Sequence, residues 1–103
     1  MKSLNIYSDY MSDSTVGSIK DNISEKPIEN KTVLLKYLKN RRAIASIIGV
    51  PIDVISGETI TDDGWLLFSD GEYEWSNDIV YYFENYNLKL PDDFINHVLK
   101  KQK

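Results

Sequence analysis

The strongest local constraint in this sequence is an Asp-Gly pair between two short aromatic-rich runs. Residues 65–68 and 73–75 are dominated by Trp, Phe, Tyr and Leu, and Asp70 and Gly71 lie between them. Asp-Gly readily adopts the positive φ angles of a type I′ turn, which joins two antiparallel strands through a two-residue loop. The pattern therefore predicts a β-hairpin over residues 65–75.

The pairing within this hairpin follows from its loop. If Asp70 and Gly71 form the loop, Ser69 faces Glu72, and each further pair lies one residue outward on both strands. Because side chains alternate between the two faces of a strand, one face carries only apolar residues: Leu66, Phe68, Tyr73 and Trp75. The opposite face is mixed: Trp65, Leu67, Ser69, Glu72 and Glu74. We expect this mixed face either to contact a partner, which includes a second copy of the chain, or to be covered by the N-terminal segment.

Three helices are predicted from the helical spacing of apolar side chains. The first spans residues 31–40 with Asn30 as its N-cap, and the second spans residues 77–86 with Ser76 as its N-cap. The third begins at Pro91, because proline suits the first turn of a helix. Its last turn is basic, which complements the helix dipole, through Lys100, Lys101 and Lys103.

The remaining segments give weaker signals. The spacing of apolar residues predicts two brief helices, near residues 44–48 and 51–57. Residues 8–30 are rich in Ser, Asp, Asn and Glu, so we expect them to be less ordered, with a short helix near 15–24. Residues 4–7 are a candidate for one further strand.

Length and composition limit the chain to one domain. Its 103 residues, of which 42% are hydrophobic, suffice for a single modest core but not for two. Helices that flank one hairpin are typical of an α+β domain. We therefore expect one α+β domain over residues 1–103, in which a small antiparallel sheet packs with three to five helices.

Composition also disfavours several kinds of chemistry. The chain has no cysteine and a single histidine, His97, so disulfides, thiolate metal sites and His-rich zinc sites are excluded. The acidic turns at Asp62 and Asp70 lack the alternating ligand spacing of a calcium loop, and no phosphate-binding or nucleophile motif is present. We expect no metal, no cofactor and no enzymatic activity. A small enzyme built on paired carboxylates is the alternative, and it predicts a closed pocket that holds two of them.

The sequence also carries no signal for a membrane. The first nine residues lack the apolar segment of a signal peptide. No apolar run approaches the ~20 residues that span a bilayer. We therefore expect a cytoplasmic protein that does not contact a membrane.

Charge is distributed unevenly along the chain. Residues 1–50 carry eight basic and five acidic side chains, whereas residues 51–103 carry four basic and eleven acidic ones. From Glu58 to Glu84 there are eight carboxylates and no Lys or Arg, and both tryptophans lie in this window. Such a window is either a solvated face or a protein-binding face, because interface hot spots are rich in aromatic residues and an anionic field steers basic partners.

A DNA-binding alternative rests on residues 41–57, which resemble a helix-turn-helix. Ala45, Gly49 and Ile55 occupy the small, turn and apolar positions of that motif. The segment that would read bases, residues 51–56, contains no Arg, Lys, Gln or Asn. We therefore expect these residues to pack rather than to bind DNA, and we expect no nucleic-acid partner.

Two motifs in the C-terminal half are similar to those of a known group of proteins. The first runs from Asp70 to Tyr86 and includes Trp75 and the pair Tyr81 and Tyr82, and the second is Leu90–Ile95. Together they resemble small bacterial proteins encoded beside polymorphic toxins, particularly immunity proteins of contact-dependent growth inhibition systems. The resemblance covers about a third of the chain and mostly concerns positions that determine the fold.

This resemblance implies a cytoplasmic antidote that binds a cognate toxin domain, commonly a nuclease, and blocks its active site or substrate surface. A nuclease presents a basic cleft to phosphates, which a rigid acidic surface with aromatic anchors can occupy. We therefore expect a basic toxin domain as the partner, with a non-toxin protein as the alternative, and leave the oligomeric state open. The expected partner-binding residues lie on the hairpin and the next helix: Trp65, Asp70, Glu72, Glu74, Asp78, Tyr81 and Glu84.

Overall fold

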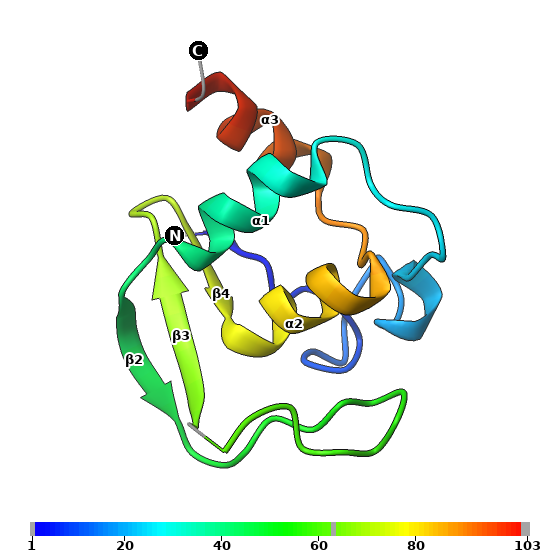
Figure 1. Ribbon diagram of the computed structural model, residues 1–103. Helices are drawn as coiled ribbons and strands as arrows, with labels where there is room; N and C mark the ends of the chain where they lie inside the picture. Colours follow the sequence, from blue (N-terminus) through cyan, green and yellow to red (C-terminus); the bar gives the residue numbers. More distant parts are fainter. Residues whose placement is uncertain (1, 63, 102–103) are drawn as a thin grey trace.

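The sheet of this protein has four strands and is mixed rather than purely antiparallel. The computed structural model describes residues 2–62 and 64–101. Its strands are β1 (Lys2–Ser3), β2 (Ala43–Ile47), β3 (Trp65–Ser69) and β4 (Tyr73–Ser76). Their order is β1-β4-β3-β2 (Figure 1), with β1 parallel to β4 and the other neighbouring pairs antiparallel. The predicted α+β class is confirmed. The sheet was predicted to be antiparallel, but one of its pairs, β1 with β4, is parallel.

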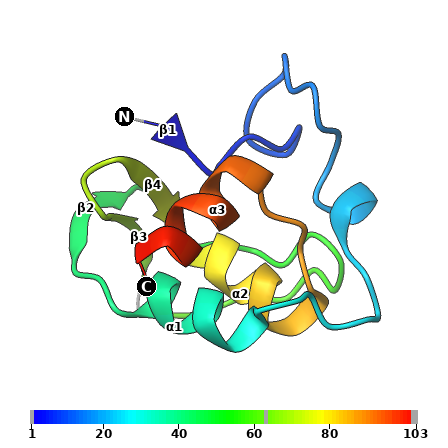
Figure 2. The same cartoon turned by 90° about the horizontal axis from the view of Figure 1, so that it is seen from above.

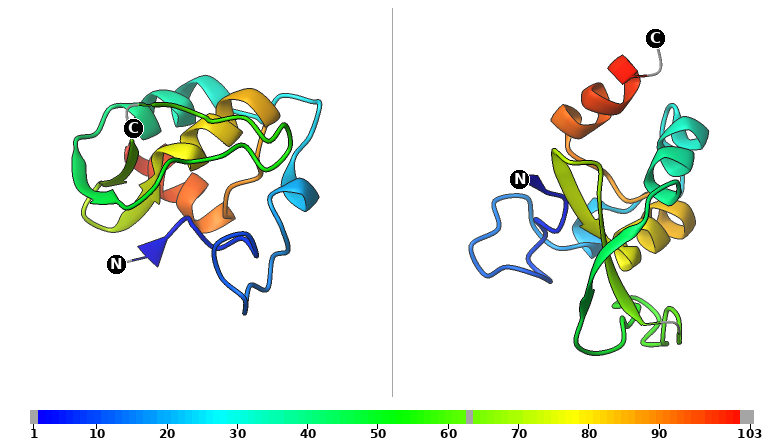
Figure 3. Two further views of the ribbon diagram at one scale, coloured as in Figure 1. Left: turned by 90° about the horizontal axis from the view of Figure 1, so that it is seen from below. Right: turned by 90° about the vertical axis from the view of Figure 1, so that its left-hand side faces the viewer.

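Three α-helices accompany the sheet, within the predicted range. They are α1 (Lys31–Lys39), α2 (Asn77–Tyr86) and α3 (Asp92–Lys101). All three predicted helices are confirmed, and Lys103 of the predicted basic end lies outside the described residues. Figure 3, right, shows α1 and α2 on one side of the sheet and the N-terminal loop on the other.

Asn30 and Ser76 occupy the N-cap positions of α1 and α2, as predicted, but neither side chain makes a capping hydrogen bond. Asn30 adopts the left-handed conformation, with φ of 62°, and its side chain makes no capping hydrogen bond. Ser76 has an extended backbone, as an N-cap requires, but its Oγ donates to the Asp78 carboxylate rather than receiving a backbone N–H. The apolar stripes of these helices, rather than their caps, therefore account for the correct predictions.

The core is built where β4 meets α1 and α3. The Trp75 indole N–H donates to the Leu38 carbonyl at 3.3 Å, and the Tyr73 and Phe94 rings meet edge to face with centroids 5.1 Å apart. The buried apolar residues come from all parts of the chain: Leu4, Tyr7, Ile19, Leu34, Tyr37, Leu38, Tyr73, Trp75, Ile79, Tyr82, Phe83, Leu88, Leu90, Phe94 and Val98.

The predicted hairpin exists, but its register is wrong by two residues. Ser69 pairs with Glu74, not Glu72, which leaves a four-residue loop closed by the Asp70 amide and the Tyr73 carbonyl at 3.2 Å. The Asp70 carboxylate accepts the Glu72 and Tyr73 amides at 2.9 and 2.7 Å, and this side-chain turn replaces the type I′ turn. Because a two-residue shift preserves the side-chain alternation, the predicted faces of the hairpin are unchanged.

The two brief helices predicted within residues 44–57 are wrong. Residues 43–47 form strand β2, which pairs with β3, and residues 48–60 form an irregular loop held by an Ile52–Thr59 bridge. Isoleucine favours strands. Over so short a run, the spacing of the isoleucines fits the helical period as well as the period of two that is typical of a strand. Pairing with β3 therefore decides the conformation.

The N-terminal segment, residues 4–30, is held by contacts rather than by regular structure. The predicted strand at residues 4–7 is wrong, because β1 is confined to Lys2–Ser3. The predicted helix near 15–24 is reduced to η1, a 3-10 turn at Lys20–Asn22. Figure 2 shows this segment along one side of the molecule and α1 on the opposite side, with α2 and α3 between them. Whether residues 8–30 are less ordered stays a prediction.

Candidate interaction surface

Asp78, predicted to face a partner, is buried at the start of α2. Only 4% of it is exposed. Its carboxylate accepts the Tyr10 hydroxyl at 2.5 Å, the Trp65 indole N–H at 3.1 Å and the Ser76 hydroxyl. Burial and the nearby Asp78 charge raise the pKa of Tyr10, so this phenol remains a donor. Asp78 thus joins the N-terminal segment, β3 and α2.

Asp70, at the tip of the hairpin, is also enclosed. Its side chain is 2% exposed and accepts hydrogen bonds from the Tyr37 hydroxyl and from His97 Nε2, the latter at 2.7 Å. Burial by itself raises the pKa of Asp70, but the hydrogen bonds from Tyr37, the two loop amides and His97 outweigh it and hold that pKa well below its usual range. Asp70 therefore ties the hairpin to α1 and α3.

Tyr81, predicted to be an exposed aromatic, is half-buried and binds a third aspartate. The Tyr81 and Tyr86 hydroxyls donate to Asp53 Oδ2 at 2.8 and 2.7 Å. Burial alone raises the pKa of Asp53, but these two hydroxyls and the amides of Ser56 and Ile55 outweigh it and lower that pKa to about 2. This contact fixes the 48–60 loop to α2, and sequence reasoning missed Asp53.

The three predicted glutamates are not gathered on one surface. Glu72 is exposed near His97, with Oε2 and Nδ1 3.4 Å apart, and Glu84 forms an exposed ion pair with Lys39 at 2.7 Å. Glu74 is half-buried on β4, opposite Ser69. Of the seven predicted partner-binding residues, only Trp65 and Asp78 line the same cleft, where the Trp65 indole N–H donates to the Asp78 carboxylate.

The surface that is rich in exposed apolar side chains lies elsewhere, on residues 44–55. From residue 48 to residue 54 its members are two residues apart, which is the spacing of one face of an extended chain. The exposed fractions are 56% for Ile44, 100% for Ile48, 48% for Val50, 48% for Ile52 and 37% for Val54, and the neighbouring Ile55 is 36% exposed. This alternation was the signal in the sequence that could have identified an extended, exposed segment.

Part of this apolar stretch forms one wall of a cleft beside Trp65. The cleft has a volume of about 240 Å³ and lies between the N-terminal segment and residues 50–54. We call it the Trp65 cleft, and it is lined by Asp9, Tyr10, Ile19, Val50, Ile52, Val54, Trp65, Asp78 and Tyr82. Its lining thus combines apolar side chains and aromatic rings with two carboxylates and no basic group.

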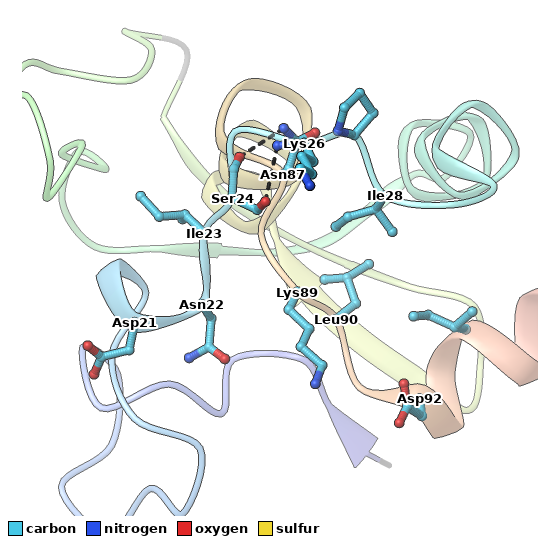
Figure 4. A pocket seen from close by; sticks show the side chains of 12 residues that line it. Asp21, Asn22, Ile23, Ser24, Lys26, Ile28, Asn87, Lys89, Leu90 and Asp92 are labelled. Atoms are coloured by element: carbon cyan, nitrogen blue, oxygen red, sulfur yellow. Dashed lines mark hydrogen bonds between the residues drawn. The ribbon is translucent and has the colours of Figure 1, made fainter.

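A second cleft, of about 590 Å³, lies between residues 21–28 and 87–95. Figure 4 shows the Asp21, Lys89 and Asp92 side chains spread apart rather than converging on one point. Its walls are braced by Asn87 Nδ2, which donates to the Ser24 carbonyl at 3.0 Å. The mixed charges give this cleft no preference for one kind of ligand.

The two carboxylates of the Trp65 cleft already hold hydrogen bonds within the protein. Asp9 Oδ1 accepts the Ile19 amide at 2.6 Å, and the oxygens of Asp78 accept the three donors described above. Both carboxylates are therefore held in position by donors of the protein itself. Within residues 2–62 and 64–101, no group of three or more His, Asp or Glu side chains is placed to hold a metal ion.

The helix-turn-helix interpretation lacks its helices. Residues 43–57 hold strand β2 and a loop with no helix, so nothing in this segment can enter a DNA groove as a recognition helix. Among the described residues, no helix is both long and apolar enough to traverse a bilayer. Comparison with known proteins finds no match: no family model fits the chain, and no curated protein or solved structure is similar to it.

Proposed function

We propose that this protein is a cytoplasmic immunity protein that binds a cognate toxin domain, a nuclease, and neutralises it. The observation that carries the proposal is the Trp65 cleft with its exposed apolar rim. The resemblance of residues 70–86 and 90–95 to immunity proteins adds the class of partner. The contact surface differs from the one expected from sequence, because Asp70 and Tyr81 serve the fold.

The apolar rim supports a protein partner. Val50, Ile52 and Val54 line the cleft, yet each remains more than a third exposed. Contiguous exposed apolar side chains around an aromatic ring are typical of interface centres, where burial by a partner provides most of the binding energy. An interface centred here would remove these side chains from water.

The charge of the cleft supports a basic partner. Asp9 is exposed at the cleft and Asp78 lies within it, and no Lys or Arg lines it. A lysine or arginine of the partner fits this lining, because its methylene groups can lie on Trp65 while its charge faces Asp9. The net charge of −4 adds long-range attraction, which speeds association with a basic protein.

Co-purification and growth protection test this proposal together. The chain is expressed with the product of any toxin-like gene encoded beside its own. Complex formation is measured at low and high salt, and survival is measured in the toxin-producing cells. We expect a one-to-one complex that abolishes toxin activity and associates more slowly at high salt. Loss of protection in cells that contain the folded chain contradicts the antidote function.

Matched variants test the site separately. Val54→Lys places a positive charge on the cleft wall, and we expect it to weaken the complex at least tenfold, because it removes apolar contact and repels a basic partner. Val16→Lys is the control, since Val16 is 42% exposed but lines a different cleft, with Ile6 and Lys89. Equal weakening by both variants, or by neither, contradicts the Trp65 cleft as the contact site. If the same cleft binds a protein that is not a toxin, that protein becomes the proposed partner and the antidote function is rejected.

A further inference from the structure

Strand β2 forms an open edge of the sheet. It is the last strand in the order β1-β4-β3-β2, and Figure 1 shows it at the outside of the molecule, with β3 on one side and no described strand on the other. The peptide groups on its outer side therefore lack a strand partner among the described residues. An edge of this kind readily accepts another strand.

This edge lacks the usual protection against pairing. Residues 43–50 contain neither a charged side chain nor a proline, whereas edge strands are commonly protected by lysine, proline or inward-facing charge. Ala43, Ala45 and Ser46 are exposed and small, so the backbone beside them is accessible. The opposite edge differs, because β1 has only two residues.

The charge pattern around β2 selects a second copy in one orientation. Arg41 and Arg42 precede the strand, so parallel pairing of two copies would place four guanidinium groups together. Antiparallel pairing moves the two pairs of arginines to opposite ends.

We propose that two copies of this chain pair antiparallel through β2, about a two-fold axis at Ser46. This register sets Ile44 of one copy opposite Ile48 of the other, so the two most exposed apolar side chains cover each other. The two four-stranded sheets become one continuous sheet.

The proposed axis passes through the part of β2 that pairs regularly with β3. The one irregularity in the pairing of β2 with β3 lies between Ala43 and Ala45, and pairing is regular from there to Ile47. Ser46 is the central residue between the two isoleucines that face across the interface. This inference concerns the protein by itself and holds whether or not the partner is a toxin.

Sedimentation of the purified full chain across a concentration series is the first test. We expect the mass of two 11.9 kDa chains for the wild type. Ile48→Lys should raise the dimer dissociation constant at least tenfold, because it places two lysines in the interface. Ile48 is fully exposed, so this variant should keep the helical circular dichroism of the wild type and, at protein concentrations below the dimer dissociation constant, its urea midpoint. Val16→Lys is the control and should remain dimeric.

Cysteine cross-linking tests the register, since the chain has no cysteine of its own. Ser46→Cys should form an intermolecular disulfide under mild oxidation, because residues that pair on the axis have Cα atoms within the distance a disulfide spans. Ala43→Cys lies three residues from the axis and should not. A monomeric wild type, an Ile48→Lys variant that stays dimeric, or stronger cross-linking at residue 43 than at residue 46 overturns the proposal. None of these results bears on toxin binding, which the co-purification tests.

Discussion

Six large apolar side chains of residues 44–55 are exposed, whereas three aspartates of the same chain, one of them within this segment, are buried. Ile48 is fully exposed, while Asp53 and Asp78 are at most 4% exposed and Asp70 has a side chain only 2% exposed. Each buried carboxylate accepts a tyrosine hydroxyl: Tyr81 and Tyr86 for Asp53, Tyr37 for Asp70 and Tyr10 for Asp78. The comparison shows that the polarity of a side chain in this sequence does not by itself predict whether the side chain is buried. Three acidic side chains join its elements, while several apolar side chains of residues 44–55 stay exposed.

The largest expected effect is that of removing a buried carboxylate. Asp78→Ala leaves the Tyr10 hydroxyl and the Trp65 indole N–H without their acceptor. We expect a loss of about 3 kcal/mol in the free energy of unfolding, measured by urea denaturation, because buried donors lose charge-assisted hydrogen bonds. Asp13→Ala is the matched control on an exposed aspartate and should change this energy by less than about 0.5 kcal/mol. Equal losses in the two variants would contradict the structural role of Asp78.

The second expected effect is a loss of stability in acid that depends on Asp53. Hydrogen bonds lower the folded-state pKa of Asp53 from 3.8 to about 2. The stabilisation is therefore fully present above pH 4 and is lost as the pH falls towards 2. It amounts to about 2 kcal/mol. Urea denaturation between pH 5 and pH 2 measures this stabilisation as the difference between the wild type and Asp53→Asn. The contribution of Asp70 is present in both proteins and therefore cancels in the difference.

In this comparison, the excess stability of the wild type over Asp53→Asn should shrink below pH 4. A difference that stays constant from pH 5 to pH 2 shows that the Asp53 charge does not stabilise the fold. A difference that grows in acid reverses the sign of the expected linkage.

The sequence predicted those parts of the fold that depend on local pattern. The apolar stripes identified α1, α2 and α3, and the two faces of the hairpin remained correct even though its register was wrong. The hairpin register depends on the Asp70 side chain, which forms the turn itself. The conformation of β2 depends on β3, which lies about twenty residues further along the chain, and local spacing cannot show this pairing.

Of the residues that line the Trp65 cleft, the sequence predicted Trp65 and Asp78. The burial of the aspartates escaped prediction because their partners are distant in sequence: Tyr10 and Asp78 are 68 residues apart, and Asp53 and Tyr86 are 33 apart. No periodicity relates such positions. The apolar wall of the Trp65 cleft did carry a signal, since Val50, Ile52 and Val54 alternate as in an extended chain.

A smaller effect distinguishes buried from exposed isoleucine. Ile79, on α2, is fully buried, and Ile79→Val should cost about 1 kcal/mol, because it leaves a small cavity in the core. Ile48→Val removes the same methyl group from a fully exposed position and should cost nothing measurable in the isolated monomer. Urea midpoints at low protein concentration compare the two. A measurable loss from Ile48→Val would show that residue 48 is covered even in the monomer.

The smallest expected effect concerns an exposed carboxylate of the same acidic region. Glu84 pairs with Lys39 at 2.7 Å, and their side chains are 42% and 51% exposed. Water screens such a pair and holding both chains in place costs entropy, so Glu84→Gln should change the free energy of unfolding by less than about 0.5 kcal/mol. The residual effect should vanish at high salt, whereas the loss in Asp78→Ala should persist, because screening by ions reaches exposed charges and not enclosed ones. Urea denaturation of both variants at low and high salt therefore separates the two classes of carboxylate by their surroundings. A salt-insensitive loss of 1 kcal/mol or more in Glu84→Gln would place Glu84 with the buried aspartates and remove the distinction.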